Sequence, residues 1–112
     1  MADSEFVFVY STVPDNVTAQ TIAEALVRAH LAACVNIHGP MNSVYEWKGA
    51  LEMGQELALF IKTRRALAEQ VIETARKLHT YTVPCFLILP IEGGNTDYLA
   101  WARAQTEGPQ IA

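Results

Sequence analysis

His79 and Cys85 are the side chains of this sequence best suited to hold a soft metal ion together. Five residues separate them, and Pro84 stiffens the segment between them. Imidazole and thiolate groups bind zinc and copper ions at about 2.0–2.3 Å. Since one chain supplies only this pair, we expect further ligands to come from a neighbouring chain. The structural alternative for His79 is a place at the end of a helix, where the helix dipole stabilises it.

His30, Cys34 and His38 form a second set of metal-ligand types. Their four-residue spacing brings side chains together only on a single helix. The predicted helix ends near His30, whereas Cys34 falls in an apolar run typical of a strand. A free cysteine in such a run packs as a small apolar side chain. We therefore expect no metal site at these three residues.

Tyr45, Glu56, Lys62 and Tyr81 are the candidates for a polar binding cleft. Lys62 ends an otherwise apolar run, and Glu56 precedes the same run. Tyr81 follows His79 closely. We predict that these four side chains line a cleft between protomers that holds a small anion or a metal complex. The alternative is a structural ion pair at the interface between protomers.

Two tryptophans are candidates for contacts between chains. Trp47 lies with Tyr45 in an alternating segment of a predicted hairpin, and Trp101 lies in the last predicted helix. Large aromatic side chains on a protruding hairpin anchor a partner more often than they face solvent. We predict Trp47 as an interface anchor, and Trp101 as an anchor or as part of the core.

Motifs of nucleophilic or phosphate chemistry are absent from the sequence. There is no Gly-x-Ser-x-Gly, no phosphate-binding P-loop and no dinucleotide-binding glycine pattern. The pair Gly93-Gly94 lacks the following Lys-Ser/Thr that would hold phosphate. We therefore expect neither an enzyme nor a site for an organic cofactor.

The elements that must position these side chains follow from apolar runs and turn residues. Four runs are typical of strands: Phe6–Tyr10, Ala33–Ile37, Leu57–Ile61 and Cys85–Leu89. Helical spacing predicts helices ending near Ala29, over Arg65–Leu78 and over Thr96–Gln105. A hairpin is expected to turn at Lys48-Gly49-Ala50, after an interruption at residues 38–40 and before a bend or interruption at Gly54. This order predicts an α+β fold, a ferredoxin-like βαββαβ sandwich with a long hairpin between the second and third strands and a C-terminal helix.

The predicted strands are apolar on both alternating faces. Right-handed crossovers place the two long helices on the same face of the sheet. The second apolar face must then be buried against something else, and another copy of the same chain is the simplest candidate. We expect a homo-oligomer.

Composition narrows the class of protein. With 112 residues, 51% of them apolar, the chain is expected to form a single domain, residues 1–112, with an ordered core over about residues 5–106. A net charge of −4 argues against nucleic acid as a partner. The acidic start lacks the charge of a secretory signal, and no apolar run reaches the roughly 18 residues of a membrane span. We expect a cytoplasmic protein with reduced cysteines and no membrane partner.

Five short motifs resemble one known family. They are Leu31-Ala32-Ala33-Cys34-Val35-Asn36-Ile37, Ser43-x-Tyr45-x-Trp47-x-Gly49, Ile61-Lys62-Thr63, His79-x-Tyr81-x-x-Pro84 and Asp97-Tyr98-Leu99-x-Trp101. From Phe6 to about Trp101 the chain resembles the CutA divalent-cation tolerance family. The resemblance implies a ferredoxin-like protomer, a tight homotrimer similar to PII signalling proteins, and a cytoplasmic role in tolerance of copper and other divalent ions. It implies no chemical reaction.

The chain departs from this family where metal binding is concerned. Some bacterial relatives are thought to bind copper through a cysteine at the end of the first strand and a pair of adjacent histidines. This sequence has Ser11 at the first place and Leu78-His79 at the second. The acidic residue that commonly follows the proline of the fourth motif is Cys85.

Two other functions compete with direct metal tolerance. One is a PII-like small-molecule sensor or signalling scaffold that uses the clefts between protomers. The other is RNA binding, because RNA-recognition domains share the order of strands and helices. Those domains display aromatic residues on their first and third strands in a basic setting, whereas Glu56–Lys62 is not basic and lacks the Gly-Phe pattern. We therefore retain the sensor as the alternative.

Overall fold

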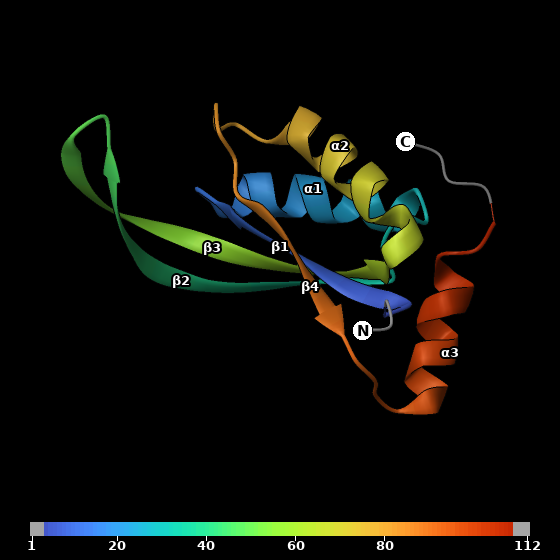
Figure 1. Ribbon diagram of the computed structural model, residues 1–112. Coiled ribbons are helices and arrows are strands. Elements are labelled where there is room, and N and C mark those ends of the chain that lie inside the picture. Colours follow the sequence, from blue (N-terminus) through green and yellow to red (C-terminus); the bar gives the residue numbers. More distant parts are fainter. Residues whose placement is uncertain (1–3, 109–112) are drawn as a thin grey trace.

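The computed structural model describes residues 4–108, which form a four-stranded antiparallel sheet and three α-helices (Figure 1). In chain order the elements are β1 (Phe6–Val13), α1 (Asn16–Arg28), β2 (Cys34–Trp47), β3 (Ala50–Arg64), a 3-10 turn (Arg65–Leu67), α2 (Ala68–Leu78), β4 (Phe86–Ile91) and α3 (Thr96–Gln105). The strands lie in the order β2-β3-β1-β4. The predicted order of elements is confirmed.

One face of the sheet is packed under α1 and α2, as predicted (Figure 1). Val7 and Val9 of β1 point to this face and are 0% exposed. Their neighbours on β3, Leu59 and Ile61, are also fully buried. Helix α1 contributes Ile22, Leu26 and other apolar residues of its inner side to the same core. Burying each large apolar side chain contributes about 1.5–3 kcal/mol, so this layer holds the protomer together.

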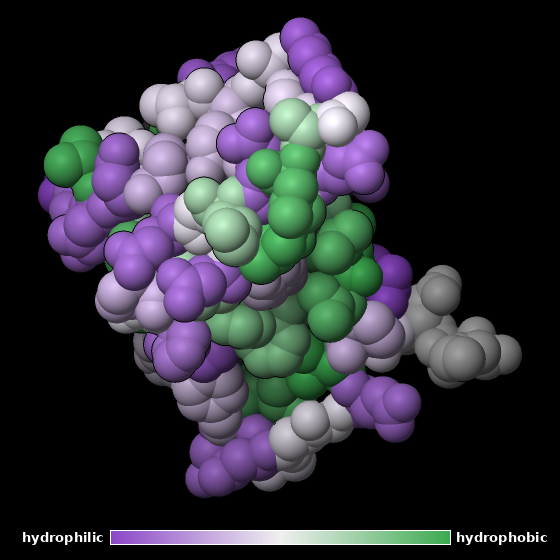
Figure 2. Space-filling model, turned by 90° about the vertical axis from the view of Figure 1, so that its left-hand side faces the viewer, coloured by the Kyte–Doolittle hydropathy of each residue, from purple (hydrophilic) through white to green (hydrophobic). Residues whose placement is uncertain are grey.

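The opposite face, which we call the open face, carries apolar side chains that no helix covers along most of its length. The Phe60 ring lies edge-on to the rings of Phe8, at 6.2 Å, and Tyr10, at 5.4 Å. Beside them on β4, Leu87 is 56% and Leu89 43% exposed. Figure 2, seen from the hairpin end, shows apolar side chains gathered in a continuous area. The predicted second apolar face is therefore present and uncovered in one protomer.

Helix α3 covers only one end of the open face. Ala102 and Leu99 of the helix pack with Phe6 at the start of β1. Asn95 caps the helix by accepting a hydrogen bond from the backbone N–H of Asp97. The predicted span of α3 is confirmed, and asparagine is a favoured residue at a helix N-cap. Within residues 4–108 no helix is long and apolar enough to cross a membrane.

The hairpin of β2 and β3 extends well beyond the helices, and we call its outer part, residues 42–55, the arm (Figure 1). Its two turn residues, Lys48 and Gly49, have φ angles of 52° and 82°, which suits a two-residue hairpin turn. The predicted interruption at residues 38–40 is a shift of register between His38 and Met41 within one strand. Gly39 there has a φ of 134°, which favours glycine.

Two details of the structure refine the prediction. β3 runs through Gly54 without a break, because Gly54 stays paired with Ser43 across the hairpin. The second helix begins as a 3-10 turn at Arg65 and becomes α-helical only at Ala68. Glu5 accepts the backbone hydrogen bond of Arg65 and so ties this turn to the start of β1.

Two fully buried hydroxyl groups on the packed face give a prediction about stability. Thr63 donates a hydrogen bond of 2.6 Å to the Leu31 carbonyl. Ser11 is 0% exposed, and its hydroxyl has no hydrogen-bond partner among residues 4–108. An unsatisfied buried polar group costs about 1–3 kcal/mol. We therefore expect Ser11→Ala to raise the free energy of unfolding by about 1 kcal/mol and Thr63→Val to lower it by about 1–3 kcal/mol.

Urea unfolding of both variants checks this pair. Ser11→Cys is a further control, since a thiol packs as a small apolar group and should also stabilise the protein. A loss of stability in Ser11→Ala would show that its hydroxyl group is hydrogen-bonded in solution.

Candidate functional site

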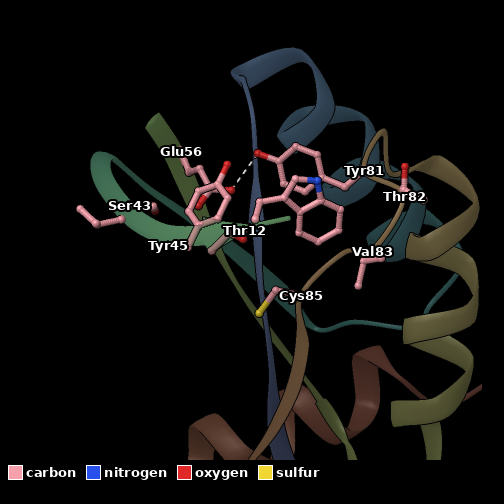
Figure 3. Close-up of a pocket in the computed structure, with 10 residues that line it drawn as sticks. Thr12, Ser43, Tyr45, Glu56, Tyr81, Thr82, Val83 and Cys85 are labelled. Carbon is pink, nitrogen blue, oxygen red and sulfur yellow. Dashed lines mark hydrogen bonds between the residues drawn. The ribbon is translucent and has the colours of Figure 1, made fainter. Parts of the chain in front are cut away.

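A cavity of about 460 Å³ lies where the arm meets the segment that joins α2 to β4. Its lining residues come from β1, the arm and that segment; they are Thr12, Ser43, Val44, Tyr45, Trp47, Glu56, Tyr81, Thr82, Val83 and Cys85. Figure 3 shows the labelled side chains around it. Alternation along β1 and β3 places Thr12 and Glu56 on the side of Phe60. The cavity therefore opens at the arm end of the open face.

Glu56 and Tyr81 form the polar centre of this cavity. The Tyr81 hydroxyl donates a hydrogen bond of 2.7 Å to the Glu56 carboxylate (Figure 3). Burial, and next this hydrogen bond, raise the pKa of Tyr81 well above its ordinary value. The hydroxyl therefore keeps its proton and holds the carboxylate in place. Three of the four predicted cleft residues, Tyr45, Glu56 and Tyr81, come together here.

Lys62, the fourth predicted cleft residue, lies elsewhere in the protomer. Its ammonium group is 3.4 Å from the Tyr98 hydroxyl and 5.4 Å from the centre of that ring. It lines a smaller cavity beside α3. Lys62 and Glu56 are on the same strand and the same face but six residues apart, which is about 20 Å along a strand. Within one chain, Lys62 is therefore not part of the cleft.

His79 lies beside the cavity with both ring nitrogens in use. Its Nδ1 accepts a hydrogen bond of 3.1 Å from the backbone N–H of Tyr81. Its Nε2 is 2.8 Å from the carbonyl oxygen of Thr12. A nitrogen that accepts from an N–H carries no proton, so the proton is on Nε2, which donates to the carbonyl. His79 thus joins the end of β1 to the segment after α2, and a metal ion would have to displace one of these bonds.

Cys85 is half-buried at the lower edge of the cavity (Figure 3). Burial, and next the nearby Glu56 carboxylate, raise the pKa of its thiol. The protonated thiol is a poor metal ligand. Within residues 4–108 no three His, Cys, Asp or Glu side chains form a group that could hold a metal ion. One protomer by itself therefore does not supply a complete metal site around the predicted pair.

The predicted interface anchors are both at the surface. Trp47 lies on the arm and lines the cavity, and it is 47% exposed. Trp101 on α3 is 45% exposed and packs only partly, with its ring centre 5.5 Å from that of Tyr98. Neither ring is part of a core cluster of the protomer. Of the two alternatives for Trp101, a place in the protomer's core is therefore excluded, and both rings are accessible to a partner.

Some cavity residues were not predicted as such. Thr12 and Ser43 line the cavity, and Trp47 and Cys85 belong to it as well as to their predicted roles. Strand alternation places Thr12 on the face of Tyr10, and Cys85 precedes the partner of Ser11 on β4. The sequence therefore places Thr12 and Cys85 near each other only when the register of β1 against β4 is known. The register depends on contacts between distant residues and is not written in either strand alone.

Comparison with known proteins decides the family. Residues 7–105 match the family model described as CutA1 divalent ion tolerance protein. The chain belongs to this family. A relative from Thermus thermophilus, a divalent-cation tolerance protein CutA, is 46% identical over 95 residues, which cover 85% of this chain and 92% of that protein. The human Protein CutA is 41% identical over 98 residues.

Solved structures of CutA proteins share the fold. The divalent cation tolerance protein of Thermus thermophilus superposes with a TM-score of 0.87 at 44% identity, covering 91% of this chain and 99% of that chain. CutA1 from a psychrotrophic Shewanella superposes with a TM-score of 0.91 at 33% identity, covering 96% and 100% of the two chains. The aligned region spans only 55% of the human and Arabidopsis relatives, so those proteins contain further sequence.

Proposed function

We propose that this protein contributes to the tolerance of divalent metal ions, copper among them, as a non-enzymatic homotrimer. The match of residues 7–105 to the divalent ion tolerance family is the observation that carries this function. The relative from Thermus thermophilus is named for the same role. Both cysteines are free thiols, which suits the reducing cytoplasm that we propose as its location.

The uncovered apolar surface supports assembly. The open face exposes Leu87 and Leu89, and the arm exposes Leu51 and Met53 at 72% and 76%. Apolar surface of this extent on a soluble chain marks an interaction site. Because the arm leaves the body of its own protomer (Figure 1), it is placed to contact a neighbouring copy. The trimer is the closed assembly that the family resemblance implies.

Direct metal binding is proposed to be weak and to involve more than one protomer. His79 gives up a hydrogen bond, and Cys85 a proton, before either becomes a ligand. Titration of the purified assembly with Cu²⁺ and with Zn²⁺ by calorimetry tests this. We expect binding weaker than that of a structural metal site, reduced by His79→Ala and by Cys85→Ser. If no binding is measured below millimolar metal and neither variant differs from the unchanged protein, direct binding is excluded. Metal tolerance would then act through partners of the protein.

A small-molecule sensor is the second candidate function, and the cavity favours it. The cavity is large enough for a metabolite and combines aromatic walls with a few polar groups, as ligand sites do. It opens at the edge of the open face, so a neighbouring protomer on that face would border it. A thermal-shift screen of metabolites tests this function. No stabilising compound in such a screen would remove its support.

A further inference from the structure

The cavity beside the arm contains a negative charge without a positive partner. Glu56 is half-buried and accepts a hydrogen bond from Tyr81. Within residues 4–108 it takes part in no ion pair; the carboxylates that do are Glu5, Glu24 and Glu73. None of the residues that line the cavity is Lys, Arg or His. A partly dehydrated carboxylate in such surroundings favours a cation as its ligand.

Three aromatic side chains line the same cavity as this carboxylate. Tyr45 and Trp47 reach the cavity from the arm, and Tyr81 reaches it from the segment between α2 and β4. Figure 3 shows the Tyr81 hydroxyl joined to the Glu56 carboxylate by a hydrogen bond, with Tyr45 drawn among the lining residues. The faces of aromatic rings attract cations, most strongly when the cation carries weakly hydrated alkyl groups. An anion is disfavoured here by Glu56.

The donor set distinguishes an organic cation from a metal ion. A metal ion needs several ligand atoms around it, and besides neutral hydroxyl groups the cavity offers a single carboxylate and one protonated thiol. Aromatic walls add nothing to metal coordination. They do match the alkyl groups around a positively charged nitrogen.

We propose that this cavity binds a small organic ammonium ion, with its nitrogen beside the Glu56 carboxylate and its alkyl groups against the rings of Tyr45, Trp47 and Tyr81. This ligand class rests on the second function above, the small-molecule sensor, and is independent of metal tolerance. Since the arm supplies two of the three rings, the position of the arm controls the site.

Calorimetry with choline tests the ligand class on the full chain, in buffer with EDTA so that metal ions make no contribution. The matched neutral compound is 3,3-dimethylbutan-1-ol, which has the shape of choline without the charge. We expect choline to bind with a dissociation constant below about 10 mM and the alcohol to bind about tenfold more weakly or worse, which is the effect of losing one ion pair and cation–π contact.

Two carboxylate variants give the matched comparison. Glu56→Gln keeps an oxygen that accepts the Tyr81 hydrogen bond but removes the charge, and it is expected to weaken choline binding about tenfold. Glu69→Gln removes an exposed charge on α2, away from the residues that line the cavity, and should leave binding unchanged. Far-UV circular dichroism checks that both variants fold.

The outcomes separate this ligand class from the sensor function. Equal affinity for choline and the alcohol, or unchanged binding in Glu56→Gln, would overturn the ammonium ion while leaving a ligand site. Choline could also fail to bind while a neutral or anionic metabolite stabilises the protein in a thermal-shift screen. That result would overturn the proposal of an ammonium ligand and support the sensor function. Failure of every compound would overturn both.

Discussion

Replacement of Phe60 by aspartate is expected to give a folded single chain that no longer assembles. Phe60 lies on the open face against Phe8 and Tyr10 and outside the packed core. A charge at this place is solvated in a lone protomer, whereas assembly would bury it. Burying an unpaired charge costs several kcal/mol. Sedimentation at micromolar concentration, together with circular dichroism, should show a monomer with native secondary structure.

Val7→Asp is the matched control on the other face of the same sheet. Val7 is fully buried beneath α1 and α2, so its replacement places an unpaired charge inside the protomer. Native domains are stable by only about 5–15 kcal/mol, and we expect this variant to be unfolded. If Phe60→Asp sediments as the unchanged protein does, the open face is not the interface. If Phe60→Asp unfolds, the face is part of the protomer's own core.

Removal of the arm is expected to have the second large effect. Residues 44–53 can be replaced by Asn-Gly, because Ser43 and Gly54 are paired across the hairpin and this dipeptide suits a two-residue turn. The arm contributes no residue to either core cluster, so the shortened protomer should fold. It should sediment as a monomer because it lacks Trp47 and the exposed apolar residues Leu51 and Met53.

Concentration-dependent melting provides the measurement for the shortened chain. An assembled protein melts at a higher temperature as its concentration rises, and a monomer does not. We expect the dependence to disappear together with the arm. Trp101→Ala is the control for the other predicted anchor, which lies on α3 and is left intact in the shortened chain. Persistence of the assembly without residues 44–53 would show that the open face alone holds the copies together.

Most residues of the candidate site could be predicted from the sequence, but their positions relative to one another could not. Tyr45, Glu56 and Tyr81 were expected together, and all three line one cavity. Lys62 was expected with them and lies beside α3 instead. Its distance from Glu56 follows from the uninterrupted course of β3 between residues 56 and 62.

The predicted metal ligands, His79 and Cys85, show that hydrogen bonds of single atoms could not be predicted either. His79 and Cys85 have the right chemistry and a suitable spacing. Whether they are available depends on the other groups that reach them. The ring of His79 is hydrogen-bonded to the carbonyl of Thr12 in β1 and to the backbone N–H of Tyr81. No pattern along the chain predicts the contact with Thr12.

The amino-acid pattern alone was sufficient for the order of the elements, the single packed face and the surplus of apolar strand surface. These follow from local alternation and from the size of two helices, which are properties of neighbouring residues. Folding in three dimensions fixed which alternating set meets the helices, how far the arm extends, and that one carboxylate shares a cavity with three aromatic rings. Such features depend on strand register and on contacts between residues far apart in the chain, which short-range preferences do not encode.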